Sequence, residues 1–247
     1  MNVNHLYNKT PNVSHFIHKQ PETVHVMGIT ESMLDERMND TNIAIEKYKV
    51  IRRDKAFNLH RGIAVYVHDT IYPKTKRRTD LEIREVESII LEIEGKKSDP
   101  SLICIVYRNP DEPAEWRDSF ELMISRISYD RYTLQILGDF NYDLNKPHLL
   151  WKSTVLQLGL EQLIKENTRV NPISQTLIDH IYTNNKNNIV ASKVIKTGIS
   201  DHYAIHLSFL QKVEKQPNKG HKVINYRCYK KFDENFYTAE LKSGSLL

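Results

Sequence analysis

The feature that most constrains this chain of 247 residues is an apolar run that stops abruptly at polar side chains, Ile136-Leu137-Gly138-Asp139-Phe140-Asn141. Residues 133–137 are rich in apolar side chains, which predicts a buried strand. Gly138 allows the backbone to bend or to come close to a ligand at the end of that strand. If the extended geometry continues, Asp139 and Asn141 point to one side and Phe140 turns into the core.

The two polar residues at this strand end are suited to phosphate chemistry. The carboxylate of Asp139 can take a proton from water or help to hold a metal ion. The amide of Asn141 can donate a hydrogen bond to an oxygen that gains negative charge. The alternative is an ordinary Asp-x-Asn turn after a strand, which is a common structure.

The apolar patterns along the chain predict an α/β fold, with a mixed sheet or two packed sheets and helices outside. Strands are predicted at residues 24–30, 48–52, 62–67, 86–93, 102–107, 133–137, 177–182, 190–195 and 204–210. Helices are predicted at residues 115–128 and 149–164, with a shorter helical stretch around residues 13–17. The inward faces of the two longer helices are Phe120, Met123, Ile124 and Ile127, and Leu156, Leu160, Leu163 and Ile164.

Composition narrows the class of protein. Charged residues make up 27%, the mean hydropathy is -0.53, and no apolar run approaches the roughly 18 residues that cross a bilayer. The first twenty residues are polar, so no secretory signal is expected. Two cysteines are too few for a disulfide framework or a zinc site. We therefore expect a nuclear or cytoplasmic protein that is neither secreted nor membrane-bound.

The character of the chain changes near residue 211. Lys, Gln, Pro, Asn and Gly dominate residues 211–221, and the aromatic and basic stretch 226–241 has too little apolar surface for a core of its own. We expect one domain over residues 1–210, followed by a linker and a truncated connector over residues 211–247.

A basic run and a net charge of +4 permit contact with a polyanion. The run Lys74-Thr75-Lys76-Arg77-Arg78 has three interpretations: contact with phosphates, a nuclear localisation signal, or a solvated hairpin tip.

Several polar residues fall at or near the ends of predicted strands, where strands of a packed sheet pair form a common cleft. They are Asn2, Glu31, Tyr107, Asp139, Asn141, Asp179, Asp201 and His202. Several carboxylates in one cleft repel each other, so a cation is expected, and oxygen and amide ligands without cysteine favour Mg²⁺ or Mn²⁺. Asp179 can orient the imidazole of His202 and favour its charged form.

Three of these residues also have an ordinary structural interpretation. Glu31 can be an acid at the start of a helix, Tyr107 can simply pack, and His202 can be a core or surface histidine.

Six motifs in chain order carry a resemblance to a known family. They are Asn2-Val3-Asn4, Thr30-Glu31, Tyr107-Arg108-Asn109-Pro110, Gly138-Asp139-Phe140-Asn141, Ile178-Asp179-His180 and Ser200-Asp201-His202. Their order resembles that of the endonuclease/exonuclease/phosphatase superfamily, which includes apurinic-site endonucleases, pancreatic-type DNases and sphingomyelinases. Residues 62–67, 87–93 and 176–182 are most similar to the endonuclease domain of non-long-terminal-repeat retrotransposons. The resemblance covers residues 1 to about 210.

The resemblance implies a four-layered α/β sandwich with two central mixed sheets and helices outside. By position it implies that Asn2, Glu31 and Asp201 surround the divalent metal. Asp139 would orient or deprotonate the attacking water, and Asn141 would support the transition state. Tyr107 would contact the scissile phosphate, and His202, held by Asp179, would be the acid/base histidine.

The function implied is a Mg²⁺-dependent DNA endonuclease that nicks target DNA for retrotransposon insertion. Two alternatives stay open: an inactive retrotransposon remnant that at most binds nucleic acid, and a phosphatase acting on a lipid or inositol phosphate. Asn2 lies one residue from the start, so the first strand of the family pattern is expected to be clipped. A full-length relative is expected to carry a reverse transcriptase after the connector.

Overall fold

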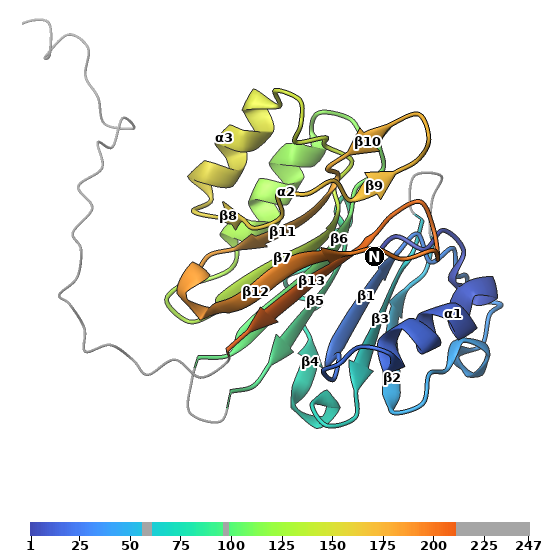
Figure 1. Ribbon diagram of the computed structural model, residues 1–247. Coiled ribbons are helices and arrows are strands. Elements are labelled where there is room, and N and C mark those ends of the chain that lie inside the picture. The colour runs from blue at the N-terminus through green and yellow to red at the C-terminus, as the bar shows by residue number, and fades with distance from the viewer. Residues whose placement is uncertain (56–60, 96–98, 211–247) are drawn as a thin grey trace, which may run out of the picture. The chain divides into compact units, whose positions relative to one another are not determined.

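The structure is a computed structural model that describes residues 1–55, 61–95 and 99–210 (Figure 1). The helices are α1 (Leu6–His18), α2 (Trp116–Ser125) and α3 (Leu149–Gln157), with short 3-10 turns at Asp40–Ile43, Tyr72–Lys74 and Lys186–Asn188. The strands are β1 (Val26–Thr30), β2 (Tyr48–Arg53), β3 (Ile63–His68), β4 (Thr75–Arg77), β5 (Glu87–Ile93), β6 (Ser101–Tyr107), β7 (Thr133–Asp139), β8 (Glu161–Gln162), β9 (Arg169–Val170), β10 (Gln175–Thr176), β11 (Asp179–Thr183), β12 (Ile189–Ile195) and β13 (Ala204–Phe209).

The largest sheet has six strands in the order β4-β5-β6-β7-β11-β8. Only its β6-β7 pair is parallel, and the other neighbours are antiparallel. One face packs against α2 and α3, which lie together in Figure 1, through a cluster that includes Phe120, Phe140 and Trp151. The inward residues predicted for the helix over 115–128 are buried in the same cluster, although α2 ends at Ser125 and Ile127 lies beyond it.

The opposite face of this sheet packs against a three-stranded sheet, β1-β3-β2. Alternate residues of β5 and β6 supply that face, such as Ile89 and Ile105, and they meet Ile63 and Val65 of β3. Helix α1 covers the outer face of the three-stranded sheet through a separate cluster that contains Leu6. Within the described residues, two further pairs, β12-β13 and β9-β10, form separate two-stranded sheets.

The α/β class predicted from the sequence is confirmed. Two packed sheets with helices on their outer faces are present, while the division into four complete layers stays a prediction. No helix within the described residues is long and apolar enough to cross a membrane. The linker and connector expected over residues 211–247 lie outside the described residues.

The helix predicted over residues 149–164 is too long. α3 ends at Gln157, and Gly159 follows in a left-handed conformation with φ of 65° that stops the helix. Leu156, expected to point inward, is 78% exposed. Leu160 and Ile164 are buried, but they lie beyond the helix.

The basic run at residues 74–78 forms the end of a 3-10 turn and β4. Arg77 forms an ion pair with Glu82 at 2.8 Å, and Arg78 forms pairs with Asp80 and Glu92. The two arginines are thus paired with carboxylates within the fold, and the run forms an edge strand and not a solvated hairpin tip.

Gly138 stands where two backbones come too close for any side chain. A Cβ added there would lie 1.8 Å from the carbonyl oxygen of Val106 on the parallel neighbour β6. Gly138 therefore permits a close approach of two backbones one residue before Asp139, whereas the sequence predicted a bend or an approach to a ligand.

We expect Gly138→Ala to lower the free energy of unfolding by about 3 kcal/mol, because the β6 backbone cannot move away. Gly198→Ala is the matched control, since a Cβ at Gly198 would meet nothing within 4 Å. Urea unfolding of both variants measures the difference. Equal stability of the two would contradict the close approach.

Candidate active site

Three strands bring polar residues to one edge of the six-stranded sheet. In the parallel β6-β7 pair Tyr107 is the neighbour of Asp139, and in the antiparallel β7-β11 pair Asp139 is the neighbour of Asp179. All three residues are buried. The register of the sheet therefore assembles this part of the site from segments up to 72 positions apart, as Tyr107 and Asp179 are.

Asn2 joins the two sheets at this edge. It lies beside Thr30 in a parallel bridge, and its Nδ2 donates to Glu31 Oε1 at 2.9 Å and to Asp139 Oδ2 at 3.0 Å. Its Oδ1 accepts a bond from the backbone N–H of Asn4. One buried amide thus fixes the separation of two carboxylates that come from different sheets.

Glu31 follows β1 in a left-handed conformation with φ of 50°, which turns its side chain into the cleft. The Tyr107 hydroxyl donates to the same Oε1 at 3.0 Å. Burial, together with the charges of Glu31 and Asp139, raises the pKa of Tyr107, so its hydroxyl stays protonated as a donor. Sequence reasoning placed Glu31 at a strand end but did not foresee this conformation.

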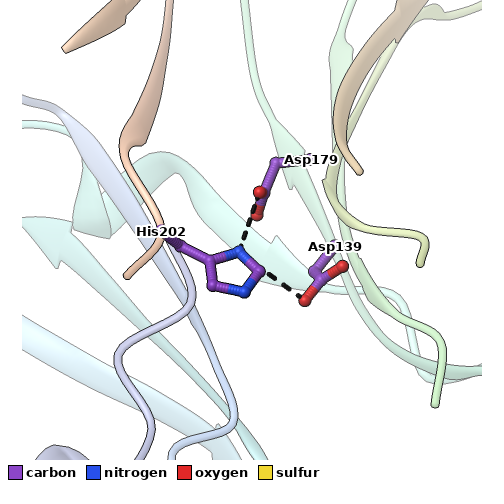
Figure 2. Close-up of side chains that lie close together, drawn as sticks. All are labelled: Asp139, Asp179 and His202. Carbon is purple, nitrogen blue, oxygen red and sulfur yellow. Dashed lines mark hydrogen bonds and ion pairs between the residues drawn. The ribbon is translucent and has the colours of Figure 1, made fainter. Parts of the chain in front are cut away.

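Asp179 and His202 form a buried pair, with Nδ1 of the imidazole 2.9 Å from Asp179 Oδ2 (Figure 2). Burial alone would lower the pKa of His202, but the Asp179 carboxylate and the charge of Asp139 outweigh it and raise the pKa to about 9. His202 is therefore an imidazolium at neutral pH. Asp179 is itself anchored, because its N–H donates to Thr168 Oγ1 at 2.9 Å.

Asp139 lies between these groups. Its Oδ2 is 3.9 Å from His202 Nδ1, and its Oδ1 accepts the backbone N–H of Asn141 at 3.1 Å. Burial raises the pKa of Asp139, and the neighbouring Asp179 raises it further, while His202 and Asn2 oppose the change. The carboxylate is thus more basic than an exposed aspartate.

Asn141 lines the same cleft as Asp139, and Phe140 is buried between the helices, as predicted. The geometric reason given by sequence analysis is wrong, because the chain does not stay extended. Asn141 has φ of 52°, and its Nδ2 donates to the carbonyl of Arg108 at 2.7 Å. A left-handed turn held by this bond directs Asn141 into the cleft.

Asp201 lines the cleft at its mouth but stands apart from the hydrogen bonds around Asn2. Its side chain is 43% exposed, and its Oδ2 accepts a bond from Arg169 Nε at 2.7 Å. That bond outweighs partial burial and lowers the pKa of Asp201.

Sequence reasoning missed Arg169 and Thr168. Both come from the β9-β10 hairpin, whose strands have two residues each and carry no periodic signal. Its polar residues, 171–176, gave no reason to expect a contact with the site.

Ser200 links the first residues of the chain to the loop that contains His202. Its hydroxyl donates to the Asn2 carbonyl at 2.6 Å and accepts the N–H of His202 at 3.2 Å. The start of the chain and residues 200–202 therefore hold each other in place.

The cleft measures about 430 Å³ and contains the side chains predicted for the site except Asp179, which lies behind His202. Its donor set fits a hard divalent cation: the carboxylates of Glu31 and Asp139 converge on the Asn2 side chain, and burial together with the charge of Asp179 raises the pKa of Asp139. Asp139, Asp179 and His202 also lie close enough to hold an ion as a trio.

Comparison with solved structures identifies the fold. The endonuclease domain of TRAS1, a telomere-specific non-LTR retrotransposon, matches with a TM-score of 0.64 and 15% identity over 85% of this chain and 96% of that one. The 3′ phosphatase NExo from Neisseria, bound to a product DNA hairpin, matches with a TM-score of 0.65 and 16% identity over 84% of this chain and 96% of that one. An endonuclease/exonuclease/phosphatase family protein from Leptotrichia buccalis matches with a TM-score of 0.63 and 14% identity over 85% of this chain and 97% of that one. No family model and no curated protein matches the sequence.

The buried pair of His202 and Asp179 predicts a pH-dependent stability. The pKa of His202 is about 9 in the folded chain against 6.5 ordinarily, so its contribution is complete below pH 6.5 and lost as the pH rises through 9. Relative to His202→Asn, the parent should lose about 3 kcal/mol of unfolding free energy between pH 6 and pH 10. Urea unfolding in chelator measures this difference, and a constant difference would contradict the charged pair.

Proposed function

We propose, on the premise that this chain has the endonuclease/exonuclease/phosphatase fold, that it is a metal-dependent phosphodiesterase. More narrowly, we propose that it is a DNA endonuclease that nicks target DNA for retrotransposon insertion. The observation that carries the proposal is the single cleft in which Glu31, Tyr107, Asp139 and His202 converge. The bonds of Asn2 to Glu31 and Asp139 hold two of these side chains in place.

The divalent cation, Mg²⁺ or Mn²⁺, would be held by Glu31, Asn2 and Asp201. Such an ion supplies positive charge that polarises a phosphoryl oxygen and stabilises the charge of the transition state. Both bonds to Glu31 within the described residues go to Oε1, so Oε2 is the oxygen left for the cation. Arg169 occupies Oδ2 of Asp201, so Oδ1 is the oxygen that would be left for the cation.

Asp139 would orient or deprotonate the attacking water. Its raised pKa makes the carboxylate a better base, and two donors, Asn2 and the N–H of Asn141, fix its two oxygens. His202 would act as a cation and acid toward the phosphate. Because Nδ1 is bonded to Asp179, Nε2 is the ring nitrogen that would donate to the phosphate.

Tyr107 and Asn141 would contact the phosphate as neutral donors. The Tyr107 hydroxyl donates to Glu31 here and would transfer that bond to a phosphate oxygen. The Asn141 amide has two N–H groups, and the bond to Arg108 uses one, which leaves the other for an oxygen of the transition state.

DNA is the proposed substrate because basic side chains accompany the acids. Arg61 and Arg169 line the cleft, and the chain carries a net charge of +4. The order of the motifs and the fold shared with TRAS1 support a retrotransposon origin, with a reverse transcriptase expected in a full-length relative. Residues 1–210 would be the catalytic domain and residues 211–247 the connector.

We expect the protein to nick supercoiled plasmid in Mg²⁺ and to lose this activity in EDTA. Asp139→Asn should reduce nicking by at least about 10²-fold, since a positioned base contributes roughly that factor or more. Asp130→Asn, an exposed carboxylate outside the cleft, is the matched control and should nick like the parent. The rate of conversion to open-circular plasmid is the measurement.

The same assay separates the alternatives. Nicking that survives EDTA and Asp139→Asn would contradict the mechanism. Salt-sensitive DNA binding without any nicking would support an inactive remnant instead. Faster phosphate release from inositol phosphates than turnover of DNA would support the phosphatase.

We expect Arg169→Gln to bind Mn²⁺ about fivefold more tightly than the parent. Removing the guanidinium frees Asp201 and deletes a nearby positive charge, whose repulsion of the ion is worth about 1 kcal/mol in a water-like dielectric. Calorimetric titration with Mn²⁺ measures the change. Unchanged or weaker binding would mean that Asp201 is not a ligand.

A further inference from the structure

The row of polar residues at the site edge of the six-stranded sheet has a further member, Glu87 of β5. Glu87 is the antiparallel neighbour of Tyr107 on β6, and Tyr107 is in turn the neighbour of Asp139. Glu87 is only 3% exposed, and it lies behind the described residues that line the cleft. A carboxylate buried in this way needs hydrogen bonds or positive charge to compensate it.

Both oxygens of Glu87 accept backbone N–H groups from two consecutive residues. Oε2 accepts the N–H of Arg61 at 3.1 Å, and Oε1 accepts the N–H of Gly62 at 2.5 Å. Gly62 has φ of 84°, and a left-handed residue lets successive N–H groups turn toward one anion. Burial raises the pKa of Glu87 to about 7, while these two bonds and the charge of Arg53 oppose the rise. The charged form of Glu87 is therefore the form that holds residues 61–62.

The same two residues are bonded on their other side to the segment that follows Glu31. The carbonyl of Arg61 accepts the N–H of Met33 at 2.8 Å, and the carbonyl of Gly62 accepts the N–H of Ser32 at 3.0 Å. Both the N–H and the C=O groups of residues 61–62 are thus occupied. The backbone from which the Arg61 side chain extends is fixed beside the cleft.

The side chain of Arg61 is available to a ligand. Arg61 is exposed and lines the cleft, and its positive charge opposes the effect of burial that raises the pKa of Tyr107. Within residues 1–55, 61–95 and 99–210 it forms no ion pair, whereas Arg169, which also lines the cleft, is bound to Asp201. An unpaired guanidinium suits the planar, two-bond recognition of a phosphate group.

We propose that Arg61 binds a backbone phosphate of the DNA, and that Glu87 is the positioning residue that holds Arg61 at the cleft. The proposal rests on the proposed function, for which it names one substrate contact and its support. Glu87 touches no reacting atom. It acts through the two backbone bonds to residues 61 and 62.

A purely structural role for Glu87 predicts a different behaviour. If Glu87 only joins a loop to the sheet, its loss weakens DNA binding to the same extent whether or not Arg61 is present. If it positions Arg61, its loss matters only while the guanidinium is there. A double-mutant cycle separates the two roles, because it measures how far the effect of one residue depends on the other.

The test measures the affinity for a labelled DNA duplex in EDTA at pH 8, where Glu87 is ionised, so that neither metal nor chemistry contributes. Arg61→Gln should weaken binding about tenfold and reduce the salt dependence by about one phosphate contact. Glu87→Gln should weaken binding about threefold in the parent and leave it unchanged when Arg61 is already glutamine. Arg126→Gln, an exposed arginine at the end of α2, is the matched control and should bind like the parent.

Nicking in Mg²⁺ supplies a second measurement. Arg61→Gln should raise KM about tenfold and change kcat less than about twofold, because a phosphate contact of this kind is made equally in the ground state and the transition state. Glu87→Gln should change the same quantity, KM, in the same direction. Glu87→Asp keeps the charge but is one methylene shorter, and it replaces Glu87→Gln in the cycle if that variant does not fold.

Equal DNA affinity of Arg61→Gln and Arg126→Gln would overturn the proposal, whatever the fate of the Glu87 variants. An effect of Glu87→Gln or Glu87→Asp that is the same with and without Arg61 would overturn the positioning role. If the parent nicks DNA only with Mg²⁺ and Arg61→Gln binds and nicks normally, the proposed function stands and this inference fails. If the Arg61 and Glu87 variants lose affinity as expected but no protein nicks DNA, the phosphate contact stands and the proposed function fails.

Discussion

The constraint on which this site depends is a pair of buried carboxylates that lie side by side and require positive charge next to them. The antiparallel register of β7 and β11 makes Asp139 and Asp179 neighbours, and both are buried. Uncompensated charges cannot stay in such a place, because burial disfavours them strongly. The imidazolium of His202 supplies one positive charge at 2.9 Å from Asp179. The pKa of Asp139 stays raised, which shows that its negative charge is not fully compensated, and a further positive charge would stabilise the site.

The position of that charge depends on residues far apart in the sequence. Asn2 spaces Glu31 and Asp139, and Ser200 ties the backbone of Asn2 to the loop of His202. The first residues of the chain and the loop at 200–202 therefore act as one unit.

Much of this arrangement could be predicted from the sequence, because strand-end polar residues are a local pattern. The strand before Gly138, the buried face of α2 and the contact of Asp179 with His202 all follow from periodicity or from motif order. The end of α3 was predictable in principle from Gly159, but a run of leucines continued the helical pattern beyond it. The left-handed conformations of Glu31 and Asn141, and the contact of Arg169 with Asp201, depend on tertiary packing and leave no local signal.

The most direct test of this account is a crystal structure of the protein soaked with Mn²⁺, with the ion located by its anomalous signal. The account predicts one ion bound by oxygens of Glu31 and its neighbours at about 2.1 Å, with the pair of His202 and Asp179 intact beside it. An ion ligated by His202 itself, or an ion that binds only outside this cleft, would contradict the account.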